Sequence, residues 1–162
     1  MARLARAAGV SLDWLGTGEE HSNAPRDSVL TLPRYDVTYA GELKRIDGAE
    51  WPQVPVFAAL IERAGADPAH TIALVADGRE MEPTIREGAL IAVDRSRADL
   101  MTPGVYALIR GRRLMLLRAA PRFDGSVVLT SDSRPGDRDE VPADRISSLG
   151  VVGRVILALS EP

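Results

Sequence analysis

The sequence predicts a mainly β protein with one main domain, preceded by a small α-helical segment. Beyond Thr71 the chain consists of short apolar runs rich in β-branched residues, and turns separate these runs. The turns are marked most clearly at Pro103-Gly104, Asp124-Gly125 and Pro135-Gly136. With 162 residues, of which 45% are apolar and 27% charged, the chain can bury one core. This pattern is typical of a mostly antiparallel β domain.

The first residues predict two short helices and a linker. Leu4 and Ala8 lie at helical spacing before Gly9, and Ser11 is a plausible cap for a second short helix that runs to Leu15. Residues 19–28 are polar and contain Pro25. We therefore assign residues 1–18 to a small helical segment, residues 19–28 to a linker and residues 29–162 to the main domain.

Two further elements are expected before the β-rich region. Residues 29–39 mix β-branched and aromatic residues with Pro33, which suits an extended edge segment. Residues 54–68 place Phe57, Leu60, Ile61 and Ala64 at helical spacing and predict one amphipathic helix that ends at Gly65.

Composition excludes several classes of protein. The chain has no cysteine and only two histidines, His21 and His70, so disulfides, thiolate catalysis, a zinc site and a histidine-based triad are not expected, and neither is a cofactor. No apolar run approaches the roughly 20 residues of a membrane span, and no secretory signal is visible, which predicts a cytoplasmic protein without membrane contact. The net charge of −3 requires any DNA contact to be local.

Several separated motifs stand out in the main domain. They are residues 77–94, the segment LMLLRA, Ser131-Asp132 and Gly153-Arg154-Val155. In this order they resemble motifs of the LexA and phage-repressor family, namely G-D-S-M-E-P-T-hydrophobic-x-x-G-D, a strand that ends in V-K-R-L, S-D-N-P and the last strand. The resemblance covers most of residues 29–159, and it implies a LexA/signal-peptidase-like antiparallel β domain.

The N-terminal segment, from Leu4 to Leu15, has the pattern L-A-x-x-x-G-V-S-x-D-W-L. This pattern resembles the end of a helix-turn-helix domain of the Xre or Cro class. The recognition helix of that class would precede Met1, so we expect the chain to start inside its DNA-binding domain. No DNA-contacting residue is identified in the chain itself.

The resemblance implies a serine nucleophile and a lysine base, and the matching positions here hold neither group. The alignment places Glu80 at the serine and Leu117 at the lysine. A register one residue later would place Arg118 at the base position, where a guanidinium cannot serve as base at neutral pH. Lys44 is the only lysine in the sequence. We therefore expect a catalytically degenerate peptidase fold that is not an enzyme.

Other serines and the linker offer alternatives. A substitute nucleophile among the turn serines would need a histidine, and His70 is the only one in the domain. Those serines are Ser96, Ser126, Ser131 and Ser133. Ala40-Gly41 resembles the scissile Ala-Gly bond of self-cleaving relatives, but we favour a flexible turn there.

Two charged groups admit a functional and a simpler interpretation. Glu80 could be an acid catalyst or form a cation site with Asp77 and Glu82, but we favour a solvated carboxylate or one paired with Arg118 or Arg79. The arginines around Gly111 could contact phosphates, but we favour a solvated hairpin tip there. These arginines are Arg110, Arg112 and Arg113.

Together these features predict a DNA-binding transcriptional repressor that forms a homodimer through its C-terminal domain. With self-cleavage gone, an antirepressor protein in the degenerate cleft could relieve repression. Two alternatives remain: an active self-cleaving serine peptidase, and a binding module whose cleft holds a peptide or small ligand.

Overall fold

The computed structural model describes residues 28–47 and 54–159. The predicted helical segment of residues 1–18 lies outside these ranges, and so does the linker except for Ser28. Within the described ranges, no helix has the length and apolar character needed to cross a membrane.

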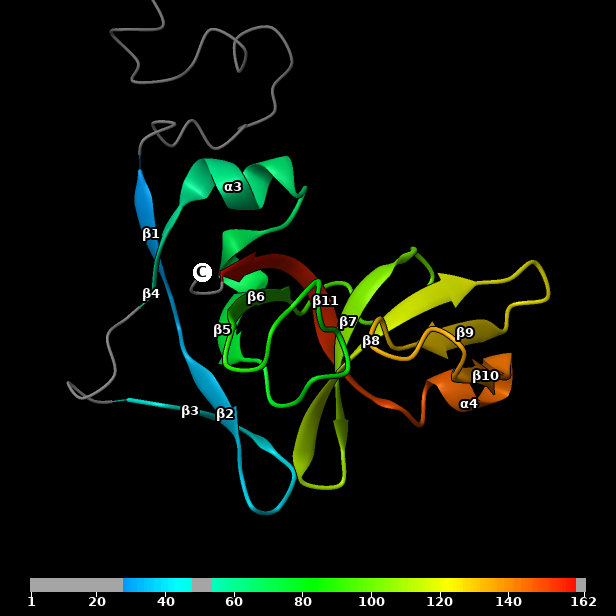
Figure 1. Cartoon of the computed structure of the whole chain (residues 1–162). Coiled ribbons are helices and arrows are strands. Elements are labelled where there is room, and N and C mark those ends of the chain that lie inside the picture. The colour runs from blue at the N-terminus through cyan, green and yellow to red at the C-terminus, as the bar shows by residue number, and fades with distance from the viewer. Residues whose placement is uncertain (1–27, 48–53, 160–162) are drawn as a thin grey trace, which may run out of the picture.

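A seven-stranded antiparallel sheet forms the body of the protein, which confirms the mainly β prediction (Figure 1). Its strand order is β10-β9-β8-β7-β11-β6-β5. The strands are β5 (Thr71–Val75), β6 (Leu90–Asp94), β7 (Gly104–Arg110), β8 (Arg113–Pro121), β9 (Val127–Thr130), β10 (Arg138–Val141) and β11 (Gly150–Leu159).

Two small antiparallel sheets and short helices complete the fold. The expected edge segment forms β1 (Val29–Leu32) and β2 (Tyr35–Val37), which Pro33 and Arg34 separate. Strand β1 pairs with β4 (Val54–Phe57), and β2 pairs with β3 (Leu43–Arg45). In the described part of the chain, the helices are α3 (Ala58–Arg63), the 3-10 helix η1 (Pro68–His70) and α4 (Ala143–Ile146).

The amphipathic helix is shorter than the sequence predicts. Residues 54–57 belong to strand β4, in which Val54 and Val56 are buried while Pro55 and Phe57 are exposed. This period of two is that of a strand with one buried face, and pairing with β1 satisfies its backbone. Helix α3 keeps only Ala58 and Ile61 on its buried face, and Phe57 is 55% exposed instead of packed.

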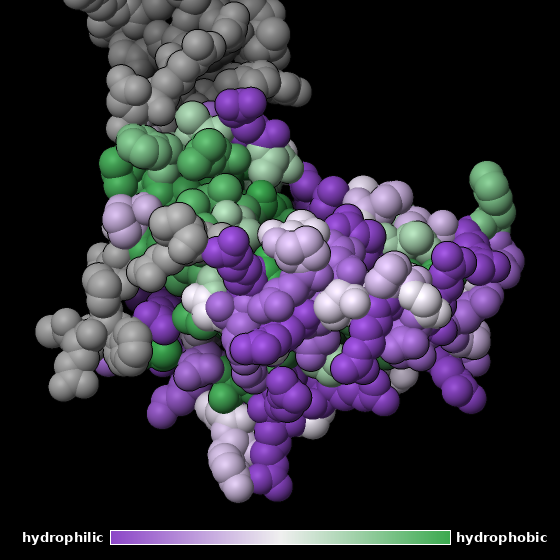
Figure 2. All heavy atoms as spheres, viewed as in Figure 1, coloured by the Kyte–Doolittle hydropathy of each residue, from purple (hydrophilic) through white to green (hydrophobic). Residues whose placement is uncertain are grey.

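Strand β11 connects the two halves of the sheet. Its first residues pair with β7 and its later residues with β6, and the register shifts once in each pairing. Buried side chains fill three clusters, around Ile91 and Met81, around Leu32 and Ile61 beneath α3, and around Tyr106. Figure 2 shows hydrophobic residues gathering over β1, β4 and α3, and hydrophilic residues across the middle of this face.

Candidate functional site

A groove of about 630 Å³ lies between the loop that follows β5, strand β8 and the loop that follows β9. The residues that line it include Glu80, Glu82, Met115, Leu117, Ser131 and Ser133. The two positions matched to the nucleophile and the base, 37 residues apart in sequence, thus meet in one groove. A volume of a few hundred Å³ or more is typical of ligand pockets.

The loop over residues 77–89 is anchored by two apolar side chains. Met81 and Ile85 are buried, and the amide of Ile85 donates to the carbonyl of Met81 at 2.8 Å. At the base of the loop, the amide of Ala76 donates to the carbonyl of Ala89 at 2.8 Å. Because the loop is fixed from below by these contacts, Glu80 and Glu82 are held at its outer side, toward the groove.

Glu80 is half-buried and folded back over Gly78. A Cβ at Gly78 would collide with the carboxylate oxygens of Glu80, and Gly78 has a φ of +121°. The carbonyl of Glu80 accepts a hydrogen bond from the amide of Ser133 at 3.0 Å. Position 80 is therefore tied to the loop after β9. It presents a carboxylate to the groove, whereas a serine nucleophile would present a hydroxyl there.

Leu117 contributes hydrocarbon to the floor of the groove. It pairs with Tyr106 of β7 and packs against the buried cluster around that residue. Its side chain has no proton to exchange. Position 117 can therefore contact an apolar group but cannot act as a base.

Arg118 is engaged by a different carboxylate from the one expected. Its Nε and Nη2 donate to Asp132 Oδ1 and Oδ2 at 2.9 and 2.7 Å, and Thr84 Oγ1 donates to Asp132 Oδ2 at 2.6 Å. The hydrogen bond from Arg118, and after it that from Thr84, holds the pKa of Asp132 below its ordinary value. This network joins strand β8, the 77–89 loop and the loop after β9.

In the described part of the chain, Glu80 pairs with neither Arg118 nor Arg79, so the two ion pairs suggested for it are wrong. Arg118 binds Asp132, and Arg79 Nε lies 3.0 Å from Glu87 Oε2 and 3.9 Å from Glu82 Oε1. The cation site is not supported either, because no cluster of three His, Cys, Asp or Glu residues suited to a metal occurs in residues 28–47 and 54–159.

Two serines lie in the groove and bond to each other. Ser131 Oγ and Ser133 Oγ are 3.0 Å apart, and the amide of Arg134 donates to Ser131 Oγ at 3.1 Å. The sequence places both in or beside predicted turns, and Ser131 also matches the S-D-N-P motif of the family. Their alternation in Ser131-Asp132-Ser133 was the only signal that they share a surface.

The other groups considered for catalysis lie elsewhere. Ser96 Oγ and Ser126 Oγ donate to the carboxylates of Asp94 and Asp124, two residues before each, and these pairs do not line the groove. The hydrogen bonds from Ser126 lower the pKa of Asp124, which makes its carboxylate a weaker base.

The lone lysine and the histidine of the domain do not line the groove either. Lys44 is exposed on β3. His70 Nδ1 lies 2.8 Å from Asp67 Oδ2 on the exposed 3-10 helix. Among the described residues, the groove therefore has no lysine or histidine that could activate Ser131 or Ser133.

Ala40 and Gly41 form the turn between β2 and β3. The amide of Gly41 donates to the carbonyl of Thr38 at 2.8 Å, and Gly41 has a φ of +81°. A Cβ at Gly41 would collide with the carbonyl of Gly111, so this turn lies against the tip of the β7–β8 hairpin. Neither residue lines the groove.

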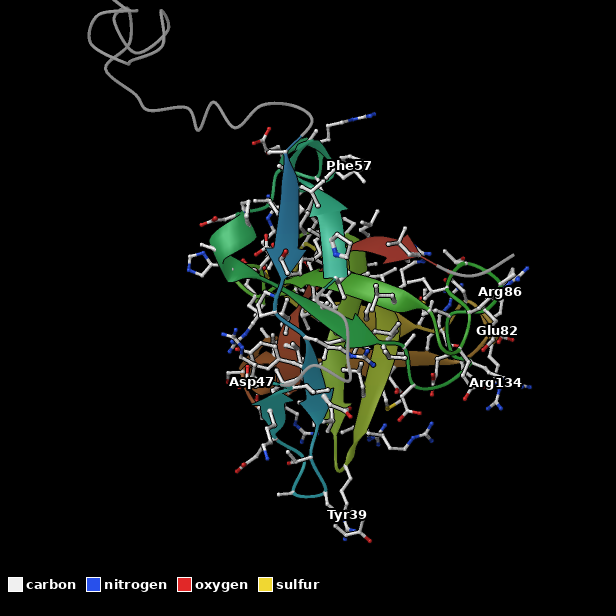
Figure 3. All side chains as sticks on the ribbon, turned by 90° about the vertical axis from the view of Figure 1, so that its left-hand side faces the viewer. Tyr39, Asp47, Phe57, Glu82, Arg86 and Arg134 are labelled. Carbon is white, nitrogen blue, oxygen red and sulfur yellow. The ribbon has the colours of Figure 1, made fainter. Side chains whose placement is uncertain are left out.

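The arginines at the β7–β8 tip fit the expected hairpin, and one of them contacts the β2–β3 turn. Arg112 lies 4.2 Å from the centre of the Tyr39 ring, a cation–π contact. In Figure 3, Tyr39 projects at the lower end of the molecule, while Glu82 and Arg134, which line the groove, lie on its right-hand side.

Comparison with known proteins identifies the family of this chain. A search of curated proteins found no match. The model of the family described as Peptidase S24-like, which includes LexA and phage repressors, matches residues 43–156 and so covers more than half of the chain. The matched range includes Glu80, Leu117 and the whole lining of the groove. The chain therefore belongs to the Peptidase S24-like family.

Proposed function

We propose that this chain is a DNA-binding transcriptional repressor whose S24-like domain does not cut and instead joins two copies of the chain. The observation that carries the proposal is the groove, which is lined by a carboxylate at position 80 and a hydrocarbon side chain at position 117. The repressor part rests on the family and on the helix-turn-helix resemblance of residues 1–18, which lie outside the described ranges.

The chemistry of the groove favours binding over hydrolysis. Amide hydrolysis by a serine needs a nearby base to take the hydroxyl proton. Glu80 offers no hydroxyl, Leu117 offers no base, and the hydroxyls of Ser131 and Ser133 face each other. What remains is a cleft with an apolar floor at Met115, Leu117 and Leu129 and a polar rim.

A dimer would serve the repressor in a direct way. Joining two DNA-binding segments raises the effective concentration of the second once the first has bound, so two weak half-site contacts become one strong contact. The S24-like domain also exposes large apolar side chains such as Met101 and Phe123, which is typical of surfaces that meet a partner.

Loss of cutting is tested by incubating the purified chain at alkaline pH. We expect the chain to stay whole on a denaturing gel and by intact mass, because no amine base faces the groove. Fragments ending at Ala40 would contradict the proposal and support a self-cleaving peptidase. The control is a double variant, Ser131→Ala with Ser133→Ala, which would abolish such fragments only if these serines produced them.

A second candidate function is suggested by the size of the groove. Its volume of about 630 Å³ would admit a peptide segment or a small ligand, and an antirepressor protein is one occupant of this kind. A ligand that bound the folded chain there would raise its melting temperature further as the ligand concentration increased, and Leu117→Glu would remove the shift.

A further inference from the structure

Large apolar side chains are exposed together on the outer side of β1, β4 and α3. Val29 is 56% exposed, Phe57 55% and Leu60 39%. Val29 pairs directly with Phe57 across the two strands, so both side chains lie on the same face of this small sheet. Leu60 follows Phe57 on α3. We call Val29, Phe57 and Leu60 the β1–β4–α3 patch, and Figure 2 shows hydrophobic residues gathering over these elements.

The core beneath the patch is already filled by other side chains. Buried and exposed positions alternate along β4, and Leu32 of β1 is buried on the same side as Val54 and Val56. The patch is therefore the second, outward face of a sheet whose inward face is packed. Exposed apolar side chains that lie together are typical of a surface that another segment covers.

The patch is separate from the groove that holds Glu80. The two share no residue. Strand β1 precedes residue 43, where the match to the family begins, so Val29 lies outside the matched range. In Figure 1, β1, β4 and α3 lie at the left of the molecule, and β9 and β10 lie at its right-hand end.

The N-terminal segment enters the domain at the edge of this patch. Val29 is the first residue of β1, and residues 19–28 connect it to the predicted helices of residues 1–18. Ten residues span at most about 33–36 Å, which bounds how far residues 1–18 can lie from Val29. A short flexible linker gives the attached segment an effective concentration of about 1 mM or more. Even a weak contact between residues 1–18 and the patch would therefore be populated.

The same segment carries apolar side chains that need a surface to cover them. Leu4 and Ala8 lie at helical spacing, and Trp14 and Leu15 end the second predicted helix. An amphipathic helix is stable when its apolar stripe packs against another apolar surface. Trp14 is the largest apolar side chain of residues 1–18, and a buried tryptophan covers about 150–250 Å².

We propose that residues 1–18 dock on the β1–β4–α3 patch of their own chain, with Trp14 against Val29 and Phe57. This contact fixes where the N-terminal segment stands on the S24-like domain, whereas an undocked linker would let it move freely. The inference goes beyond the proposed function. It concerns how two parts of one chain meet, and it requires neither DNA nor a second copy.

The test uses Trp14 as a fluorescent reporter. The chain has two tryptophans, Trp14 and Trp51, so Trp51→Phe leaves Trp14 alone. In this background we expect Trp14 to emit at short wavelength and to be protected from acrylamide. Adding Phe57→Glu should lower the docking constant about tenfold or more, because a charge replaces an apolar contact. The emission of Trp14 should then move to longer wavelength, and quenching by acrylamide should increase.

The matched control is Phe123→Glu in the same Trp51→Phe background. Phe123 is an exposed phenylalanine in the β8–β9 turn, away from the patch, and its exchange should leave the emission of Trp14 unchanged. An emission that responds equally to both variants, or to neither, contradicts the inference. So does a protected Trp14 that becomes exposed on dilution, because a second copy would then be covering the patch.

A second measurement leaves the patch intact. Because the chain has no cysteine, Glu62→Cys gives a single attachment site for a nitroxide label, at an exposed position of α3 next to the patch. A nitroxide quenches tryptophan only at short range, so we expect it to quench Trp14 in the Trp51→Phe chain. The same label at Glu140→Cys, an exposed position on β10, should not. Equal quenching from both sites, or none from position 62, contradicts the inference and leaves the proposed function standing, since alkaline incubation tests that function without involving the patch.

Discussion

At the scale of single residues, Asp132 shows how the groove is held together. Its two carboxylate oxygens accept three hydrogen bonds, two from Arg118 and one from Thr84. The residues come from strand β8, the loop after β9 and the 77–89 loop. Asp132 therefore fixes the three segments that line the groove, although it is not itself one of the lining residues.

Arg118→Met should lower the free energy of unfolding by about 1 kcal/mol at neutral pH, because the variant removes a two-point, partly exposed ion pair. The pKa of Asp132 is lowered in the folded state, so its contribution is fully present above the unfolded pKa of about 3.9 and is lost as pH falls through the folded pKa. Denaturant unfolding at several pH values checks this. The difference between parent and variant should shrink in acid, and a constant difference would contradict the role of Asp132.

At the scale of elements, the β2–β3 hairpin shows how a turn can be fixed by a neighbour. Its turn has a residue with positive φ at Gly41, and the carbonyl of Gly111 from the β7–β8 hairpin leaves no room for a side chain there. Tyr39 adds a contact with Arg112. The Ala40-Gly41 bond, which resembles a cleavage site, thus lies against another hairpin.

Gly41→Ala should cost more stability than Gly88→Ala. Both glycines have a φ of +81°, so each substitution costs about 1 kcal/mol in backbone strain, but only the Cβ at position 41 meets another backbone. Denaturant unfolding gives the global cost, and hydrogen exchange at the Gly41 amide shows whether the hairpin opens locally. Equal costs at the two positions would show that the contact with Gly111 contributes nothing.

At the scale of the whole molecule, the side chain of Arg97 joins the end of α3 to the main sheet. Asp94 is fully buried at the end of β6. Its Oδ2 lies 3.4 Å from Arg97 Nε, close enough for an ion pair, but the two atoms do not form a hydrogen bond. Arg97 also donates to the carbonyls of Ala64 and Gly65, which end α3. These hydrogen bonds attach the layer formed by β1, β4 and α3 to the main sheet, in addition to the apolar contacts between the two.

Arg97→Ala should lower the free energy of unfolding by about 2 to 3 kcal/mol, because it leaves Asp94 buried without its cation and frees the last carbonyls of α3. Arg63→Ala, an exposed arginine at the end of the same helix, is the control and should change stability little. Thermal unfolding of both variants provides the measurement. A similar loss in both would mean that Arg97 acts only as a surface residue.

The fold class and the turns at Asp124-Gly125 and around Gly111 follow from the sequence, because they depend on local pattern, such as the period of apolar residues and the residues that turns require. The pairing of the segments that supply Glu80 and Leu117 came from the resemblance to a known family. Only the folded chain shows that residues 54–57 pair as a strand, that Arg118 binds Asp132, and that the turn at Gly41 lies against Gly111. Each of these depends on segments distant in sequence, because pairing and burial are settled by which surfaces meet and a local pattern does not contain that information.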